Sequence, residues 1–379
     1  MRDVIVLGIG QTIFGKTPER TATDLGREAV QEAIKDCGIN PKDIQVAYTA
    51  RRINAQDDSQ RILMAHGITR IEMFNVENAC AGGSTAVRGV WKDIASGLYD
   101  VGIAIGTEAV TGLPKTGALA SRNDLDAELG RTMPASFALV ARRQMAIHGA
   151  TIQDFARVSA KNHRHAVHNP FAQYRNELTE EEIINSRMIS DPITLLQCCP
   201  NSDGAAAVIM CSIEYARKYT TRLIRLSGSS LVSGDYVFKR DDITQSPFSR
   251  TAIRAAYEMA GIAPEDINVA EIHDAFANEE ILRYEDLKLC EPGEGVALLR
   301  SGATELGGRV PVNPSGGLLS LGHPLSASGV RVVVDITRQL RGRAGGMQVE
   351  NAKVGVAHML GGSVTGLDGG ACGIHVLVN

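Results

Sequence analysis

The chain contains the same short segment twice, and this duplication constrains its fold more than any other feature. "GINPKDIQVA" (Gly38–Ala47) and "GIAPEDINVA" (Gly261–Ala270) are identical at seven of ten positions. Each copy follows a stretch with helical periodicity, "LGREAVQEAIKDC" or "TAIRAAYEMA", and each leads into residues typical of a strand. The shared glycine is typical of a helix C-terminus, and the proline of the break after it. The sequence therefore predicts an α/β unit that occurs twice.

Two further pairs of similar segments follow the repeat in the same order. "GGSTAVRGV" after Cys80 is similar to "SASGVRVVV" after His323, and "VGIAIGTEAVTG" from Val101 is similar to "VGVAHMLGGSVTG" from Val354. Alternating strands and helices favour a layered α/β fold with mostly parallel sheets, whose sites gather at the carboxyl ends of strands. We therefore expect Cys80 and His323 to occupy equivalent strand-to-helix turns that face each other between the two halves.

The positions of these matches divide the chain into two halves. The N-terminal half is predicted to cover residues 1–222, with an inserted loop domain at about residues 113–200, and the C-terminal half residues 223–379. Part of the insertion is strongly basic: residues 141–176 contain six lysines and arginines against one acid. Such a segment either binds a polyanionic small molecule or forms a solvated helical face. The basic candidates for binding such an anion are Arg142, Arg143, Lys161 and Arg164.

Composition excludes several classes of function. The net charge of −4 over 379 residues argues against nucleic-acid binding, and the chain has no apolar run of the length that a membrane span needs. The seven cysteines are scattered and never spaced as CxxC, which predicts reduced thiols and a cytoplasmic location. We predict no metal site, because the cluster His163, His165 and His168 lacks a fourth ligand type nearby.

Cys80 stands immediately before a run of tiny residues and a predicted helix, in "FNVENACAGGSTAV". By itself this pattern is also typical of a small core residue beside a closely packed helix. A helix N-terminus stabilises anions and a neighbouring imidazole can take a proton, so Cys80 facing His323 would be an activated nucleophile. The tiny residues after it would then let a substrate reach the sulfur and leave N–H groups free for an oxyanion.

Two more histidines are predicted at strand ends of the C-terminal half. His273 lies in "EIHDAF", directly after the second copy of the repeat, and His358 lies in "VAHMLGG" before a Gly-Gly turn. Single histidines at such positions are often structural, but three at strand ends facing a cysteine favour a site.

At this point the sequence resembles the thiolase superfamily over essentially its whole length. The segments "NVENACAGGSTAV", "NSDGAAAVIM", "NPSGGLLSLGHPLSASG" and the final "GG" loop occur in the order of that family. The resemblance implies an αβαβα sandwich of five layers, with two five-stranded mixed sheets around buried helices and an inserted loop domain. It also implies homodimers or higher oligomers, and acyl-CoA together with free coenzyme A as the substrates. Coenzyme A is then a co-substrate, and no covalently bound cofactor is expected.

Within the superfamily, "HDAF" resembles the branch of sterol carrier protein x and the archaeal acetoacetyl-CoA thiolases. By this resemblance Cys80 is the acylated nucleophile, His323 the base that activates it, and His273 part of an oxyanion hole. The second cysteine that many thiolases use at the substrate α-carbon is missing from "AHMLGG", and Ala275 replaces the cysteine of "HDCF". His358 is the candidate for that acid/base role, with Cys372 in reserve. Gly361 and Gly362 of the final loop are candidates for binding the substrate or coenzyme A.

The predicted function is thiolysis of a 3-oxoacyl-CoA, or the reverse Claisen condensation, through an acyl group on Cys80. The resemblance leaves 2-benzoylsuccinyl-CoA and acetoacetyl-CoA as candidate substrates, and it implies a small zinc-ribbon/OB-fold protein as a partner subunit. Two alternatives remain. One is a condensing enzyme of the ketoacyl or hydroxymethylglutaryl-CoA synthase type, and the other is a non-catalytic thiolase-like subunit of a complex. A retro-aldolase of this branch is disfavoured, because it needs no cysteine nucleophile.

Overall fold

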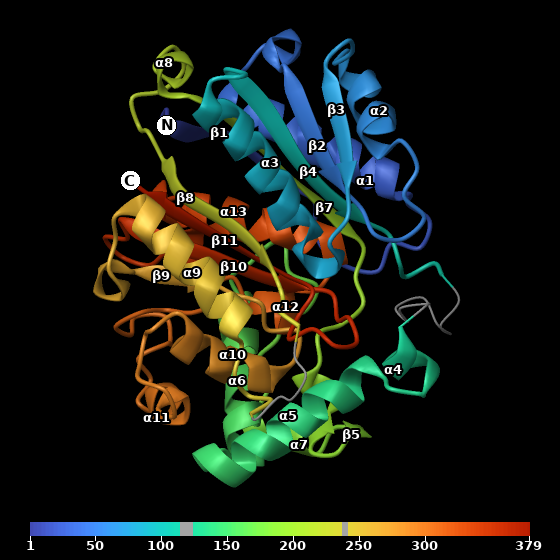
Figure 1. Cartoon of the computed structure of the whole chain (residues 1–379), viewed down its shortest axis with the longest axis vertical. Coiled ribbons are helices and arrows are strands. Elements are labelled where there is room, and N and C mark those ends of the chain that lie inside the picture. Colours follow the sequence, from blue (N-terminus) through green and yellow to red (C-terminus); the bar gives the residue numbers. More distant parts are fainter. Residues whose placement is uncertain (114–123, 237–241) are drawn as a thin grey trace.

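A computed structural model describes residues 1–113, 124–236 and 242–379 of the chain. Among these residues, nine strands form one mixed sheet in the order β3-β2-β4-β7-β1-β8-β11-β10-β9 (Figure 1). The link between β1 and β8 is a single residue pair, Ile5 with Arg225, so the sheet consists of two parts that meet at one point. The strands are β1 (Val4–Gln11), β2 (Val46–Ala50), β3 (Glu72–Val76), β4 (Val101–Glu108), β7 (Gly204–Ser212), β8 (Arg225–Ser233), β9 (Val269–Glu271), β10 (Val354–Gly361) and β11 (Ala371–Val378).

The two parts of the sheet have the same topology. In the first part β3, β2 and β4 are parallel, and β7 and β1 follow antiparallel. In the second part β9 and β10 are parallel, and β11 and β8 follow antiparallel. The equivalent of β3 is reduced to one parallel bridge between Val312 and Ala270. The resemblance implied two five-stranded mixed sheets. The described part of the second half has four strands and this bridge, and the two halves join through one residue pair of β1 and β8.

The helices complete five layers. α1 covers the outer face of the first part by contacting β1, β4 and β7, and α9 covers the outer face of the second by contacting β8 and β11. α3 and α13 lie between the two parts, since each contacts strands of both. The predicted αβαβα architecture is therefore confirmed. The helices are α1 (Ala22–Cys37), α2 (Asp58–Leu63), α3 (Gly82–Ser96), α8 (Ile213–Ala216), α9 (Pro247–Ala260), α10 (Ala277–Asp286), α11 (Gly295–Arg300), α12 (Gly317–Leu321) and α13 (Leu325–Leu340).

Helices α1 and α9 end as the repeated segment predicts. Gly38 and Gly261 follow them in the left-handed conformation, with φ angles of 67° and 66°. This conformation costs glycine little, and it turns the chain toward the next strand. Each glycine is followed by a short 3₁₀ turn that begins with the repeated proline, η1 (Pro41–Asp43) or η5 (Pro264–Asp266). The same local signals thus produce equivalent positions in both halves.

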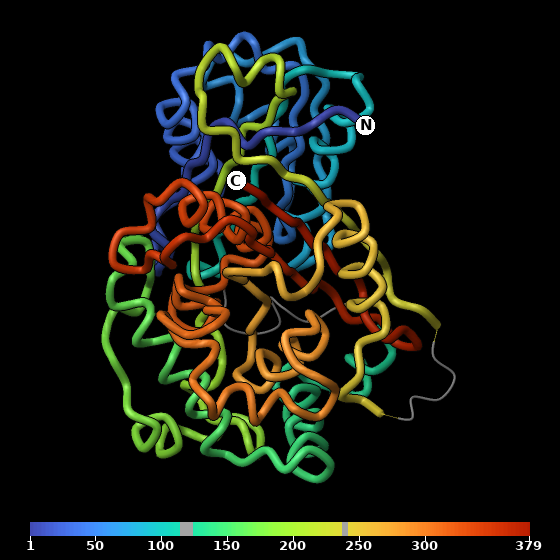
Figure 2. The backbone as a smooth tube through the Cα atoms, turned by 90° about the vertical axis from the view of Figure 1, so that its left-hand side faces the viewer, coloured from blue at the N-terminus to red at the C-terminus, as the bar shows by residue number. Residues whose placement is uncertain are grey.

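The described residues of the inserted segment lie at the bottom and along one side of the C-terminal half in Figure 2, away from the blue residues of the N-terminal half. Residues 114–123 of the predicted insertion lie outside the described residues, and the predicted boundary at residues 222/223 stays a prediction. In the described residues we find no helix long and apolar enough to span a membrane. The elements of the insertion are α4 (Leu125–Glu128), α5 (Met133–His148), α6 (Ile152–Ala166), α7 (Glu180–Ile184), β5 (Met188–Ser190) and β6 (Ile193–Thr194).

Candidate active site

Cys80 lies in a single helical turn, η3 (Ala79–Ala81), that runs directly into α3. The first residues of α3 are buried, and they pack against α13. A Cβ atom on Gly83 would lie 2.3 Å from the carbonyl oxygen of Ser326 in α13, so only glycine allows this close approach. The small residues after Cys80 therefore serve packing between two helices, which corrects the expectation that they admit the substrate. This packing brings the turns that carry Cys80 and His323 together.

The structure brings Cys80, His273 and His323 into one cluster. The sulfur of Cys80 and one ring nitrogen of each histidine all lie within 4.8 Å of one another. The rings of His273 and His323 meet edge to face, with centroids 5.7 Å apart. Cys80 is partly buried, and both histidines are almost completely buried. A cysteine of the first half thus meets two imidazoles of the second.

Each histidine is held by a partner on its Nδ1 atom. Nδ1 of His273 lies 3.1 Å from a carboxylate oxygen of Glu279, and Nδ1 of His323 lies 2.8 Å from the Ser328 hydroxyl. The Ser328 hydroxyl donates to the carbonyl of Pro324, so it accepts the Nδ1–H of His323. Both Nε2 atoms are buried without a hydrogen bond of standard geometry, and they are the atoms left to face Cys80. Sequence reasoning missed Glu279 and Ser328, although both lie within six residues of their histidines.

The charges in this cluster favour an ion pair at neutral pH. Burial alone would raise the pKa of the Cys80 thiol, but the electrostatic effect of His323 and hydrogen bonds from both histidines lower it to about 5. Burial alone would lower the pKa of His273, but the Glu279 carboxylate and the Cys80 thiolate raise it to about 10. Cys80 is therefore a thiolate beside a protonated His273, which is the reactive form of a nucleophilic cysteine.

His358 does not belong to this cluster. Its ring is completely buried, its Nδ1 accepts the backbone N–H of His273 at 3.5 Å, and its Nε2 lies 3.2 Å from the Ser249 hydroxyl of α9. Burial and the positive charges of Arg283 and His273 hold its pKa well below the ordinary value. The prediction that His358 exchanges protons with substrate is wrong, because the ring points toward the outer helix. Cys372 is also completely buried, and burial raises its pKa to about 12.

A cavity of about 1730 Å³ opens beside the cluster. Gly361 and Gly362 line it, as do the residues directly before Cys80. Gly361 packs so closely on the Cys80 turn that a Cβ atom would lie 2.2 Å from the carbonyl oxygen of Asn78. Other residues that line the cavity include Lys16, Arg52, Glu77, Ala79, Arg131, Met133, Leu195, Cys198, Cys199, Asn201 and Leu319.

The four basic residues predicted to bind an anion do not line this cavity. Lys161 is completely buried, with Nζ 2.8 Å from the Glu280 carboxylate, so assigning it to a ligand is wrong. Arg164 donates to Glu305 at 2.8 and 3.0 Å. Arg142 forms an ion pair with Asp191, and Arg143 lies 3.6 Å from Asp242. Among the described residues, the lysines and arginines in the cavity lining are instead Lys16, Arg52 and Arg131, which sequence reasoning missed because they are far apart in the chain.

A cysteine close to two histidine ring nitrogens, beside a cavity of this size, is typical of enzymes with a cysteine nucleophile. Family models agree with that class. "Thiolase, N-terminal domain" matches residues 4–214, and "Thiolase C-terminal domain-like" matches residues 229–366. The chain belongs to the thiolase family, and the predicted class of enzyme, an acyltransferase of the thiolase type, is confirmed with it.

Individual proteins similar to the chain give the same result. An acetyl-CoA acetyltransferase of Methanothermobacter thermautotrophicus is 40% identical over 99% of both chains. The benzoylsuccinyl-CoA thiolase subunit BbsB of Thauera aromatica is 39% identical over 95% of both. Among solved structures, one titled "Ltp2-ChsH2(DUF35) aldolase" has a TM-score of 0.87 and 28% identity, covering 99% of this chain and 97% of that one. Human mitochondrial 3-ketoacyl-CoA thiolase shares the fold, with a TM-score of 0.77 and 18% identity over 100% and 99% of the chains.

Proposed function

We propose that this thiolase cleaves a 3-oxoacyl-CoA with free coenzyme A, and that Cys80 carries the acyl group between the two half-reactions. One observation supports this most: the Cys80 thiol, with a pKa lowered to about 5, has two histidine ring nitrogens close to its sulfur. A cysteine with no catalytic role in such a buried place would have a raised pKa, as Cys198 and Cys372 do.

The proposed reaction begins with the thiolate of Cys80. It attacks the C3 carbonyl, forming a carbon–sulfur bond and an oxyanion that the protonated His273 stabilises. When the oxyanion collapses, the bond between C2 and C3 breaks, and its electron pair leaves as the enolate of an acyl-CoA. The enolate takes up a proton at C2 and departs. The thiol of free coenzyme A then gives its proton to His323 and attacks the Cys80 thioester, which restores the thiolate.

The residues that line the cavity also support a binding site for coenzyme A there. We assign Lys16 and Arg52 to its phosphate groups, because both line the cavity and Lys16 is exposed there. Arg131 is a weaker candidate, because it lies 2.7 Å from Asp126 and 3.6 Å from Asp124. Gly361 and Gly362 lie at the Cys80 end of the cavity, where the thioester would bind. Lys16 and Arg52 thus take the anion-binding role that the sequence suggested for Arg142, Arg143, Lys161 and Arg164.

The experiment that tests this function is a thiolysis assay with acetoacetyl-CoA, longer 3-oxoacyl-CoAs and 2-benzoylsuccinyl-CoA, each with free coenzyme A. We expect acyl-CoA products from at least one substrate, and the preferred one identifies the acyl group. The variant Cys80→Ala should lose several orders of magnitude in rate, because removing a nucleophile normally has that effect. A loss below about tenfold, or no thiolysis of any substrate, contradicts the proposal.

The similarity to a structure titled as an aldolase supports one second candidate, carbon–carbon cleavage without an acyl-enzyme. The same variant separates the two reactions. An aldolase would retain its activity in Cys80→Ala and would need no free coenzyme A. The close contact of Cys80 with two histidines favours thiolysis.

We also propose that the chain forms a homodimer through the edge strand β3. Within the part of the chain that the structure describes, β3 pairs with β2 on one side only, and an unpaired edge is a template for another strand. Phe74 of β3 is 39% exposed and nearby Met64 is 63% exposed, and a hollow of about 440 Å³ lies between β3 and α2. Sedimentation of the purified chain tests this, with Phe74→Lys expected to shift a dimer toward monomer. A monomeric wild-type chain contradicts it.

A small zinc-ribbon/OB-fold protein is the proposed partner subunit, and one similar structure carries a title that names a second component. Full thiolysis by the isolated chain, unchanged when the partner is co-expressed, would contradict a requirement for it.

We propose a cytoplasmic location, because all seven cysteines are free. Cell fractionation tests the location.

A further inference from the structure

A second cysteine, Cys199, lies between the backbone segments that carry the two catalytic histidines. Its N–H donates to the carbonyl of Ala275, two residues beyond His273, at 2.9 Å. Two residues after it, Asn201 pairs in parallel with His323. Cys199 is therefore held from both sides by the segments that orient the imidazoles, and it lines the same cavity as the Cys80 turn.

The Cys199 thiol is free to act on a ligand. It has no hydrogen bond to any residue that the structure describes, whereas the neighbouring Cys198 thiol donates to the carbonyl of Thr194 at 3.3 Å. Burial, and next the negative charge of the Cys80 thiolate, hold the pKa of Cys199 well above its ordinary value. It thus keeps its proton at the pH at which Cys80 has lost its own.

Thiolysis requires such a proton, because the enolate that leaves must be protonated at C2. The two residues that the sequence suggested cannot supply it: His358 points toward α9, and Cys372 is completely buried. His273 is protonated, but its Nε2 faces Cys80 and its Nδ1 is bound to Glu279. Cys199 is protonated and lies in the cavity wall, and its thiol has no hydrogen bond to any described residue.

Given the proposed thiolase function, we propose that Cys199 is the acid that protonates the substrate α-carbon, and the base that removes that proton in the reverse reaction. As the C2–C3 bond breaks, the electron pair left on C2 takes the proton of the Cys199 thiol, and a carbon–hydrogen bond forms. Cys199 is then a thiolate. The proton that His323 takes from the thiol of incoming coenzyme A returns to Cys199, so the site ends the cycle as it began.

The test separates acylation of Cys80 from proton transfer at C2 in the variant Cys199→Ser, whose side chain has nearly the same volume. The first readout is acylation of Cys80 by acetyl-CoA or succinyl-CoA, followed by mass spectrometry, and it needs no acid at the α-carbon. The second readout is exchange of the α-hydrogens of the same acyl-CoAs in D₂O, followed by NMR. We expect acylation within about threefold of wild type and exchange slower by about 100-fold, the scale of general acid–base catalysis.

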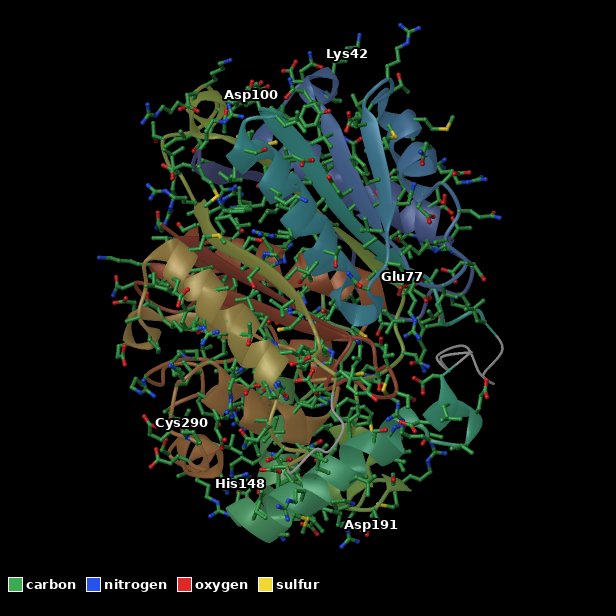
Figure 3. All side chains as sticks on the ribbon, in the orientation of Figure 1. Lys42, Glu77, Asp100, His148, Asp191 and Cys290 are labelled. Carbon is green, nitrogen blue, oxygen red and sulfur yellow. The ribbon has the colours of Figure 1, made fainter. Side chains whose placement is uncertain are left out.

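The control is Cys290→Ala, which removes a partly buried thiol that is not in the cavity lining. Cys290 lies far from Glu77 of that lining (Figure 3). It should leave both readouts unchanged. Exchange in Cys199→Ser reduced by less than tenfold overturns the proposal, and so does a loss of exchange in Cys198→Ala but not in Cys199→Ser. If the wild-type chain neither becomes acylated nor thiolyses any substrate, the thiolase function itself fails, which is a different result.

Discussion

At the scale of single residues, two thiols in one cavity are held in opposite protonation states. Cys80 is a thiolate because the two neighbouring histidines lower its pKa more than its burial raises it. Cys199 stays protonated because burial, and next the negative charge of the Cys80 thiolate, raise its pKa. The difference comes from which side chains surround each sulfur, since the two residues are chemically identical. Glu279 acts on Cys80 indirectly, because its carboxylate raises the pKa of His273 and so keeps that imidazole charged.

The pH dependence of Cys80 acylation follows from these shifts. The reactive pair exists when Cys80 has lost its proton and His273 has kept its own, so the rate should rise through pH of about 5 and fall through about 10. In Glu279→Gln the carboxylate that raises the pKa of His273 is absent, so the alkaline limb should move to lower pH. Rapid-quench measurement of acylation across this range checks both limbs. An alkaline limb that does not move in the variant would show that His273 does not set it.

At the scale of elements, the contact between α3 and α13 positions the site. Gly83 of one helix meets the backbone of Ser326 and Val330 of the other. A second tight fit orients the segment after His273: Asp274 accepts the N–H of Leu318 at 2.6 Å, and Gly317 next to it has a φ of 60° and no room for a side chain. Buried helix contacts and buried carboxylates thus fix the positions of groups that react.

Gly83→Ala should destabilise the fold. The added methyl group would lie 2.3 Å from a carbonyl oxygen and 2.6 Å from a backbone nitrogen of α13, and neither atom can move alone. We expect a loss of about 1–3 kcal/mol in the free energy of unfolding, in spite of the better helix propensity of alanine. Gly15→Ala is the matched control, because its Cβ atom would meet nothing within 4 Å, and it should change the free energy by less than about 0.5 kcal/mol. Urea denaturation followed by circular dichroism measures both, and equal stabilities would contradict the packing described.

At the scale of the whole molecule, two copies of one α/β unit pack against each other (Figures 1 and 2). The first copy supplies Cys80 and the second supplies His273 and His323. Equivalent strands end at the same central region, so the nucleophile and its partners meet only when both halves are folded and packed. The inserted segment adds Met133, Cys198 and Cys199 to the cavity wall.

The sequence predicts those features of the fold and the site that depend on residues close together in the chain. Cys80 and His323 could be paired from sequence because the repeat makes their turns equivalent. His358 was misassigned because a position at a strand end does not say which face the side chain takes, and alternation along β10 turns it toward α9. Lys161 was misassigned because its partner Glu280 is remote in sequence. Cys199 gave no signal, since the pairing that places it beside Ala275 exists only in the folded chain.

The central claim is that the sulfur of Cys80 carries the acyl group during turnover. The most direct measurement is mass spectrometry of peptides from the enzyme quenched in acid during thiolysis of its preferred 3-oxoacyl-CoA. We predict an acyl group on the peptide that contains Cys80, formed and lost at rates that match turnover. Turnover with no acylated peptide, or with the acyl group on another residue, would contradict this account.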